Sequence, residues 1–366
     1  MGRQLAARDV ASTKLSSKQM KHKTIILSLM LIAILAGAFL AYTHFSNNTP
    51  EYTDPDTDEV TAKMIPVGPA FNADSAMAFC QAQCDFGPRT MNSEAHERCG
   101  KWIADKFRQY GLEVINQKAD LTGYDGTTLH ATNIIASYKP EQTTRILLCA
   151  HWDSRPWADN DPDEANWHKP VMGANDGASG VAVMLEIARL LSTPDEQHPA
   201  PELGIDFICF DAEDWGTPQW SDAADNGNSW ALGAQYWASN LHRDGYEARF
   251  GILLDMVGGQ GARFFAEGMS KYYAPHIVRK VWRAAKVVGF ESFFPRRDGI
   301  GVTDDHVPVN EKARIPTIDV IAYYPECQQS SFGPTWHTVL DDMDHLDRTT
   351  LQAVGQTMVQ VLYSEK

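Results

Sequence analysis

The chain has 366 residues, of which 43% are hydrophobic and 22% are charged, a composition typical of a folded globular protein rather than a disordered or fibrous one. Its net charge at pH 7 is −15. A nucleic-acid-binding surface has to be basic, so this charge argues against nucleic acid as a partner.

The first 23 residues form a basic tail. Asp9 is their only acid, against six lysines and arginines, so the tail carries a charge of +5. The whole chain carries −15, which leaves −20 for residues 24–366. The acidic character therefore belongs to the part of the chain that we expect to fold.

An uncharged apolar run, "TIILSLMLIAILAGAFLAY", follows the tail at residues 24–42. It is close to the roughly 20 residues that a helix needs to cross a bilayer. The basic flank predicts that the amino terminus stays inside and that the rest of the chain lies outside. The alternative is a cleaved signal peptide, since "AGA" is a small-residue pattern that can precede cleavage. We favour an uncleaved anchor because the run exceeds the usual signal core of about 7–15 residues.

Residues 43–66 are polar and acidic, and they indicate a flexible linker before a folded domain at 67–366. A domain of this size does not depend on disulfides for stability. A disulfide among Cys80, Cys84 and Cys99 is one expectation. Cys149 and Cys209 lie in apolar runs and are expected to be buried free thiols.

Apolar runs alternate with helical patterns through the domain. Runs that are apolar throughout are typical of central strands covered on both faces. Apolar stripes at helical spacing precede Gly111 and Gly289, and two others occupy 181–191 and 351–361. This alternation predicts an α/β sandwich with a mostly parallel sheet. The predicted strands are 133–138, 145–151, 204–210, 250–257 and 316–322.

Polar side chains recur where the predicted strands end. In an open α/β sheet, ligands gather at the carboxyl ends of the strands. The long segments 154–175 and 214–230 also follow strands there, and loops of that length are usually functional or disordered. The strand-end residues are His151, Asp153, Asp211, Glu213, Asp214 and Asp255.

Two further polar residues lie outside the strands. Asp176 precedes a helical stripe, so by itself it is expected to cap a helix. His337 by itself is expected to be a surface or hydrogen-bonded histidine. Taken together with the strand-end acids, however, both indicate a metal site, because clustered carboxylates need a cation or shared protons. Aspartate, glutamate and histidine are normal zinc ligands.

The ordered motifs "AHWDS", "GANDGASG", "FDAED", "LLDMVG", "TDDHVP" and "WHTVLDDMDHLD" resemble those of the M28 family of zinc aminopeptidases and, within it, the glutaminyl cyclases. The similarity spans most of residues 85–366. It implies a three-layer sandwich in which helices flank a central mixed, mostly parallel sheet.

The resemblance implies one of two ligand sets. The aminopeptidases bind two zinc ions, for which His151 and Asp255 would hold one ion and Asp214 and His337 the other, with Asp176 as the bridge. The cyclases bind one zinc ion, for which Asp176, Asp214 and His337 would be the ligands. Many relatives have two glutamates where this chain has Glu213 and Asp214, so the metal ligand would be one methylene shorter.

The aromatic residues favour the cyclases. Trp336 and Phe332 match aromatic positions of the cyclase pattern, and Trp220 matches a third, although one extra residue precedes it. We expect these side chains to wall a pocket for the flat glutamine side chain. The alternative is ordinary core packing, since the chain holds ten tryptophans.

The reaction implied is cyclisation of an N-terminal glutamine of a peptide or protein to pyroglutamate, with release of ammonia. Glu213 would carry the proton from the attacking amine to the leaving nitrogen. Asp255 and Asp304 would pair and orient the leaving amide. One zinc ion would stabilise the developing oxyanion.

Two other functions stay open at this point, a zinc aminopeptidase and a membrane-anchored ectodomain that only binds. Closeness to bacterial-type cyclases, with the apolar run at 24–42, predicts a single-pass protein of the inner (cytoplasmic) membrane whose folded domain faces the periplasm. The alternative location is the periplasm or the medium after cleavage.

Overall fold

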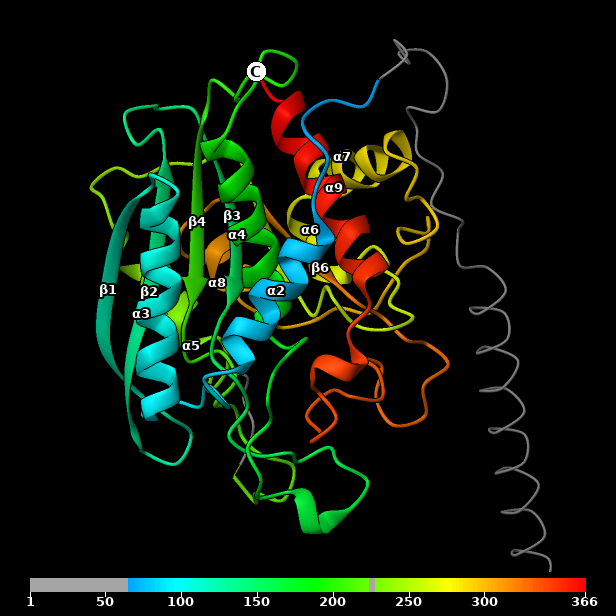
Figure 1. The fold of residues 1–366 in the computed structure, drawn as a ribbon. Helices are drawn as coiled ribbons and strands as arrows, with labels where there is room; N and C mark the ends of the chain where they lie inside the picture. The colour runs from blue at the N-terminus through cyan, green and yellow to red at the C-terminus, as the bar shows by residue number, and fades with distance from the viewer. Residues whose placement is uncertain (1–64, 224–227) are drawn as a thin grey trace, which may run out of the picture. The chain divides into compact units, whose positions relative to one another are not determined.

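The computed structural model describes residues 65–223 and 228–366, which fold around one central sheet (Figure 1). The strands are β1 (Glu113–Thr122), β2 (Thr128–Tyr138), β3 (Arg145–His151), β4 (Gly204–Phe210), β5 (Gly251–Asp255) and β6 (Thr317–Ile321). The α-helices are α2 (Ala73–Cys84), α3 (Glu94–Gln109), α4 (Ala178–Ser192), α5 (Leu232–Ser239), α6 (Gly268–Tyr273), α7 (Pro275–Val287), α8 (His306–Glu311) and α9 (Arg348–Ser364). Short 3-10 helices are η1 (Glu164–Asn166) and η2 (Met343–His345).

The sheet is mixed and mostly parallel, as the resemblance implied. Its strand order is β1-β2-β4-β3-β5-β6. The pairs β3–β4, β3–β5 and β5–β6 are parallel, whereas β2 runs antiparallel to both β1 and β4. The four strands from β4 to β6 in this order therefore present their carboxyl ends at the same edge.

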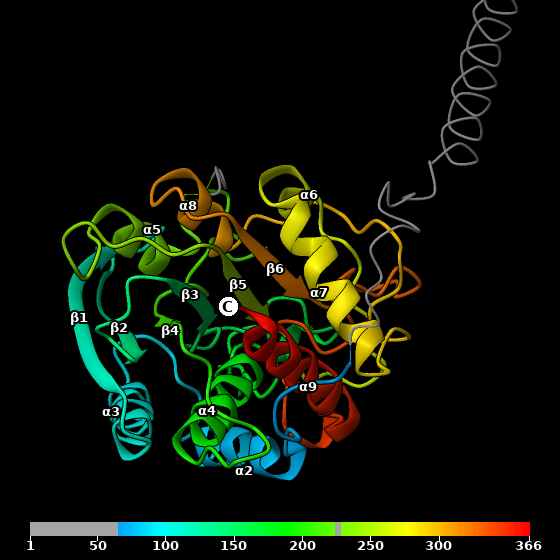
Figure 2. The same ribbon diagram turned by 90° about the horizontal axis from the view of Figure 1, so that it is seen from above.

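Helices cover both faces of the sheet (Figure 2). The larger hydrophobic core lies between one face and α2, α3, α4, α7 and α9. The smaller core lies on the opposite face under α5 and α8. Residues alternate between the two cores along β3, since Ile146, Leu148 and Ala150 face the larger core and Leu147 and Cys149 the smaller. A strand buried on both faces has to be apolar throughout, which is why these runs do not alternate in polarity.

A buried ion pair fixes the edge of the sheet opposite the strand ends. Arg145, at the start of β3, donates from Nε and Nη2 to the two carboxylate oxygens of Asp206 in β4, at 2.6 and 2.7 Å. Tyr246 donates to the same carboxylate at 2.7 Å. Breaking a buried pair by removing one partner typically costs about 3–5 kcal/mol. This pair therefore stabilises the sheet without contacting its carboxyl edge.

The cysteine predictions are met in part. All six cysteines are free, so the disulfide expected among Cys80, Cys84 and Cys99 is absent. These three thiols are buried in the packing of α2 and α3. Burial raises the pKa of Cys84 to about 11 and that of Cys99 to about 12. Cys149 and Cys209 are buried free thiols, as predicted.

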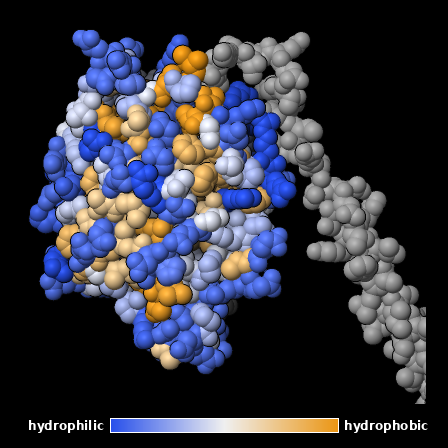
Figure 3. Space-filling view, turned by 45° about the vertical axis from the view of Figure 1, so that its right-hand side comes forward, coloured by the Kyte–Doolittle hydropathy of each residue, from blue (hydrophilic) through white to orange (hydrophobic). Residues whose placement is uncertain are grey.

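The predicted membrane location needs correction. Within residues 65–223 and 228–366, no helix is both long and apolar enough to cross a bilayer. The described surface in Figure 3 is a mosaic of hydrophilic and smaller hydrophobic areas. This finding contradicts the expected inner-membrane location, which is withdrawn. The segment 24–42, like the tail and most of the linker, lies outside the described residues, and the domain boundaries stay predictions.

Candidate active site

The parallel strands deliver polar side chains to one cavity of about 500 Å³ at their carboxyl edge. β3 ends on His151 and β5 ends on Asp255, while four residues after β4 the chain reaches Asp214. His337 arrives from the long segment between β6 and α9. Residues lining the cavity include Asp176, Glu213, Trp230, Asp255, Asp304, Phe332, Trp336 and His337.

Asp176, Asp214 and His337 form one cluster, as the resemblance implied for a single metal ion. Their side chains are buried, and one potential ligand atom from each lies within 4.8 Å of the others. His337 Nε2 lies 3.1 Å from Asp214 Oδ1 and 3.8 Å from Asp176 Oδ2. Asp176 does not cap α4, since the N-cap position belongs to Gly177 and no side chain bonds the first amides. Its carboxylate is therefore free for the cluster.

This first cluster fits a divalent cation such as zinc. Among the described residues, no hydrogen bond of good geometry reaches either carboxylate oxygen of Asp214, which is 1% exposed; the charged groups near its Oδ1 are His337 Nε2 at 3.1 Å and Arg155 Nη1 at 3.7 Å. A buried carboxylate without a partner is costly, and a cation would remove that cost. Two aspartates and one histidine are also a donor set that leaves a coordination position open for substrate.

His151, Asp176 and Asp255 form a second cluster that shares Asp176 with the first. His151 Nε2 lies 2.8 Å from Asp176 Oδ1 and 3.1 Å from Asp255 Oδ1. Burial, reinforced by the charges of Asp304 and Asp176, raises the pKa of Asp255 to about 7. Asp255 faces His151 Nε2 at 3.1 Å, the same distance that separates Asp214 from His337 Nε2 in the first cluster. Each cluster could therefore hold a cation.

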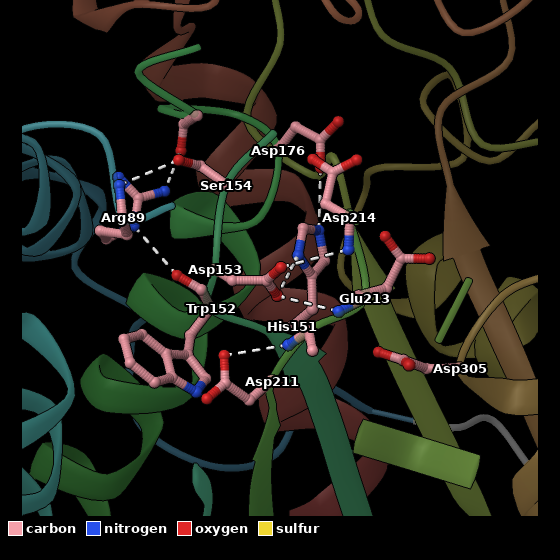
Figure 4. A network of polar contacts seen from close by, with 12 residues as sticks. Arg89, His151, Trp152, Asp153, Ser154, Asp176, Asp211, Glu213, Asp214 and Asp305 are labelled. Atoms are coloured by element: carbon pink, nitrogen blue, oxygen red, sulfur yellow. Dashed lines mark hydrogen bonds and ion pairs between the residues drawn. The ribbon is translucent and has the colours of Figure 1, made fainter. Parts of the chain in front are cut away.

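Two buried carboxylates orient the loops that carry the clusters (Figure 4). Asp153 accepts hydrogen bonds from the backbone amides of Glu213 and Asp214, both at 3.1 Å. Asp341 accepts from the amides of Asn175 and Asp176 at 2.8 and 3.1 Å. Hydrogen bonds of this kind, made around a metal site, fix the direction of the residues that bind the metal. The sequence marked Asp153 only as a strand-end acid and did not single out Asp341.

The Arg89 side chain connects the end of β3 to the segment that precedes Asp176. It is fully buried and donates to the backbone carbonyls of Trp152, Met172 and Gly173. Its backbone amide also donates to Ser154 Oγ at 2.9 Å (Figure 4). The end of β3 and the approach to Asp176 are thereby held together. The sequence alone gave no role to this arginine.

Glu213 and Asp214 diverge, although the chain has left the strand there: β4 ends at Phe210 and Ala212 has a left-handed φ of 52°. Asp214 turns toward Asp176, whereas Glu213 points to the other side (Figure 4) and lines the cavity. Burial foremost, and the nearby charge of Asp304, raise the pKa of Glu213 well above its usual value. A carboxyl group with a raised pKa holds a proton more readily, which suits a group that accepts and returns one.

Asp304 lines the same cavity as Asp255, and the pair that the resemblance implied between these two residues stays a prediction. Asp304 also has a neighbour that the sequence did not suggest, because carboxylate oxygens of Asp304 and of Asp319 in β6 lie within 4.8 Å of each other. Burial raises the pKa of both groups, and Asp304 raises that of Asp319 further. The signal available in the sequence was a single acid inside the apolar run of β6.

The aromatic wall differs from the prediction at one position. Phe332 and Trp336 line the cavity, with ring centroids 5.0 Å apart. Trp220 does not line it. Its ring instead contacts Trp157 and, in a stacked geometry with centroids 6.1 Å apart, Trp167.

Trp230 takes the place expected for Trp220. It lines the cavity, and its ring stacks on that of His337 at 6.0 Å with an interplanar angle of 9°. Both tryptophans lie in the segment 214–230, so the sequence located the loop but chose the wrong residue. The extra residue before Trp220 was the only signal against that choice.

The chain is similar to known members of one enzyme family. Residues 133–362 match peptidase family M28. The chain is 28% identical over 252 residues to the Aminopeptidase YwaD of Bacillus subtilis (strain 168), covering 65% of this chain and 45% of that protein. It is 27% identical over 249 residues to the Glutaminyl-peptide cyclotransferase of Bos taurus, covering 62% and 64%. The chain thus spans less than two thirds of the length of each of these curated relatives.

Among solved structures, the fold is similar to the crystal structure of Bacteroides thetaiotaomicron glutaminyl cyclase bound to N-acetylhistamine. The TM-score is 0.79 at 55% sequence identity, and the match covers 82% of this chain and 100% of the other.

Proposed function

Because the chain belongs to peptidase family M28 and is 55% identical to a bacterial glutaminyl cyclase, we propose that it is a zinc-dependent glutaminyl-peptide cyclotransferase. Its substrates would be peptides or proteins with an N-terminal glutamine. In the reaction, the α-amine of the glutamine attacks its own γ-carboxamide carbon. The five-membered pyroglutamate ring closes and ammonia leaves.

One observation carries this proposal. Glu213, which is half-buried, lines a cavity together with Asp176 and His337 of the first cluster and the rings of Trp230, Phe332 and Trp336. A flat amide side chain can be held between such rings. The reaction depends on folding a flexible side chain onto its own amine, so a confining pocket contributes by orientation.

Asp176, Asp214 and His337 are the residues that would hold one zinc ion. When bound, the ion supplies Lewis-acid polarisation of the substrate carbonyl. Within the described chain, Asp214 Oδ1 faces His337 and Arg155 while its Oδ2 has no hydrogen-bond partner, so a cation would complete the surroundings of this buried carboxylate. This supports a single ion at the first cluster.

The remaining acids would handle protons and orientation. Glu213 takes a proton from the substrate amine and returns it to the leaving nitrogen. Asp255, whose pKa of about 7 leaves it partly protonated at neutral pH, can donate a hydrogen bond to the substrate amide. Asp304 lies in the same wall and can accept one.

A zinc aminopeptidase is the second candidate. The observation in its favour is the second cluster, in which His151 and Asp255 could share Asp176 with a second ion. Against it, the chain is 55% identical to a bacterial glutaminyl cyclase, in a match that covers 82% of this chain.

One assay separates the candidates. Purified protein is offered a Gln-initiated peptide and a Leu-initiated peptide, and ammonia and free amino acid are measured with and without a chelator. We expect ammonia from the Gln peptide only, loss of that activity with chelator, and one zinc ion per chain. Free leucine without ammonia, or two zinc ions per chain, would support the aminopeptidase. Release of neither ammonia nor free amino acid from the two peptides would contradict the proposal and favour a binding role.

The two tryptophans of the 214–230 segment provide a second prediction. Trp230→Ala should lower kcat/KM by about 10–100-fold, since burying a large apolar side chain is worth about 1.5–3 kcal/mol. Trp230→Phe should show a smaller loss of kcat/KM than Trp230→Ala, because an aromatic ring remains in the wall. Trp220→Ala is the matched control and should keep kcat/KM within about 3-fold of the wild type, because Trp220 packs on Trp157 and Trp167 and does not line the cavity. A larger loss in Trp220→Ala than in Trp230→Ala would contradict the assignment.

A further inference from the structure

Arg155 is a buried arginine in the loop that follows β3. Its side chain is 1% exposed, although a guanidinium group is almost always charged. It does not line the 500 Å³ cavity. Burying this charge requires that its donors be satisfied, so its partners reveal what the residue holds together.

The first partner is Asp159, one helical turn along the chain and equally buried. Arg155 donates from Nε to Asp159 Oδ1 at 3.0 Å and from Nη2 to Asp159 Oδ2 at 2.7 Å. This bidentate geometry fixes the direction of both groups. The pair is neutral overall, so its effect on a nearby metal ion is mainly one of position.

The second set of partners lies just after β4. Arg155 Nη1 donates to the backbone carbonyls of Asp214 and Gly216, at 3.1 and 3.0 Å. The same nitrogen lies 3.7 Å from the carboxylate oxygen Asp214 Oδ1. Arg155 therefore holds the backbone on which the candidate ligand Asp214 is carried.

Asp159 extends the contact to the other candidate ligand. Its Oδ1 lies 3.4 Å from His337 Nδ1, the ring nitrogen opposite the one that faces Asp214. The next residue, Asn160, donates from its backbone amide to the His337 carbonyl at 3.0 Å and from its side chain to the Trp336 carbonyl at 3.1 Å. His337 has a φ of 53°, a left-handed conformation that a non-glycine residue keeps only when its surroundings hold it.

The guanidinium also supports the aromatic wall. Arg155 Cζ lies 4.7 Å from the ring centroid of Trp230 and 5.2 Å from that of Trp157. One side chain thus contacts the loop of Asp214, the partner of His337 and the back of the cavity wall.

We propose that Arg155 is a positioning residue: through Asp159 and the backbone after β4, it fixes Asp214 and His337 at the spacing needed to bind one zinc ion, and it supports Trp230 against the substrate. This inference rests on the proposed zinc-dependent function. Arg155 touches neither the reacting atoms nor the metal position, and it acts through its neighbours.

The test compares zinc affinity, measured by competition with a chromophoric chelator, in the full chain and in Arg155→Met and Arg155→Lys. Loss of an outer-shell partner typically weakens metal binding by about 10–100-fold, and we expect a change in that range for Arg155→Met. The zinc affinity of Arg155→Lys should lie between those of the wild type and of Arg155→Met, because a lysine keeps the charge but not the bidentate geometry. At saturating zinc, Arg155→Met should also raise KM for a Gln-initiated peptide.

Arg145→Met is the matched control, because Arg145 forms an equally buried bidentate pair with Asp206 at the opposite edge of the sheet. It should lower the urea midpoint but leave zinc affinity and KM within about 2-fold, since distant sites act independently. Wild-type zinc affinity in a folded Arg155→Met variant would overturn the proposal, as would an equal loss in Arg145→Met. Should Arg155→Met not fold, unchanged zinc affinity in Arg155→Lys would overturn it. Failure of the wild type to bind zinc would instead contradict the proposed function.

Discussion

Replacement of Glu213 by glutamine is expected to lower kcat by about 10²–10⁴-fold, the usual contribution of a general acid or base. Glutamine has nearly the same shape but cannot accept the amine proton or return it to the leaving nitrogen. Zinc content should not change, because Glu213 lies outside both candidate metal clusters. Steady-state kinetics with a Gln-initiated peptide and a metal count on the same sample measure both quantities.

Glu213→Asp is the matched control. It keeps the carboxyl group but withdraws it by one methylene, so part of the activity should remain. The order of kcat should be wild type, Glu213→Asp, Glu213→Gln. An active Glu213→Gln variant would show that another group carries the proton, and Asp304, which faces the same cavity, would be the next residue to examine.

Replacement of His337 by alanine should weaken zinc binding by more than about 100-fold, the upper end of the cost of losing even an outer-shell partner. His337 supplies the only nitrogen of the first cluster, so two aspartates would remain. Activity should fall to background. Equilibrium dialysis with zinc, followed by the ammonia assay, measures both effects.

His151→Ala tests the second cluster in the same way. His151 and His337 are both buried histidines that approach Asp176. If one zinc ion binds at the first cluster, His151→Ala should keep one ion per chain, with reduced activity because Asp255 and Asp176 lose a partner. A wild type with two ions that falls to one in His151→Ala would instead indicate the aminopeptidase site.

Several features could be predicted from local sequence. The apolar runs at 145–151 and 204–210 match β3 and β4 residue for residue. β5 was predicted at 250–257 but ends at Asp255, because Met256 takes a left-handed conformation with a φ of 48°. β1 was not predicted. It is an edge strand whose outward side chains are polar, so it has no continuous apolar run.

The aromatic wall shows why other features could not be predicted. Trp230 reaches the cavity because the loop folds closely over Gly216, where a Cβ atom would lie 1.9 Å from the Trp230 ring. Trp220 packs instead on Trp167 from another loop. The choice between two tryptophans in one segment depends on these contacts, and neither local spacing nor composition encodes them.

The sequence by itself determined the apolar central strands and the acids and histidines that follow them, because these features depend on burial and backbone periodicity within a few residues. Only the tertiary structure decided which buried groups orient the loops that carry these acids and histidines. Asp153 bonds amides 60 and 61 residues away, and Asp341 bonds amides 166 and 165 residues away. Such partners are set by how loops from separate strands meet at one edge of the sheet, and that meeting exists only in the folded chain.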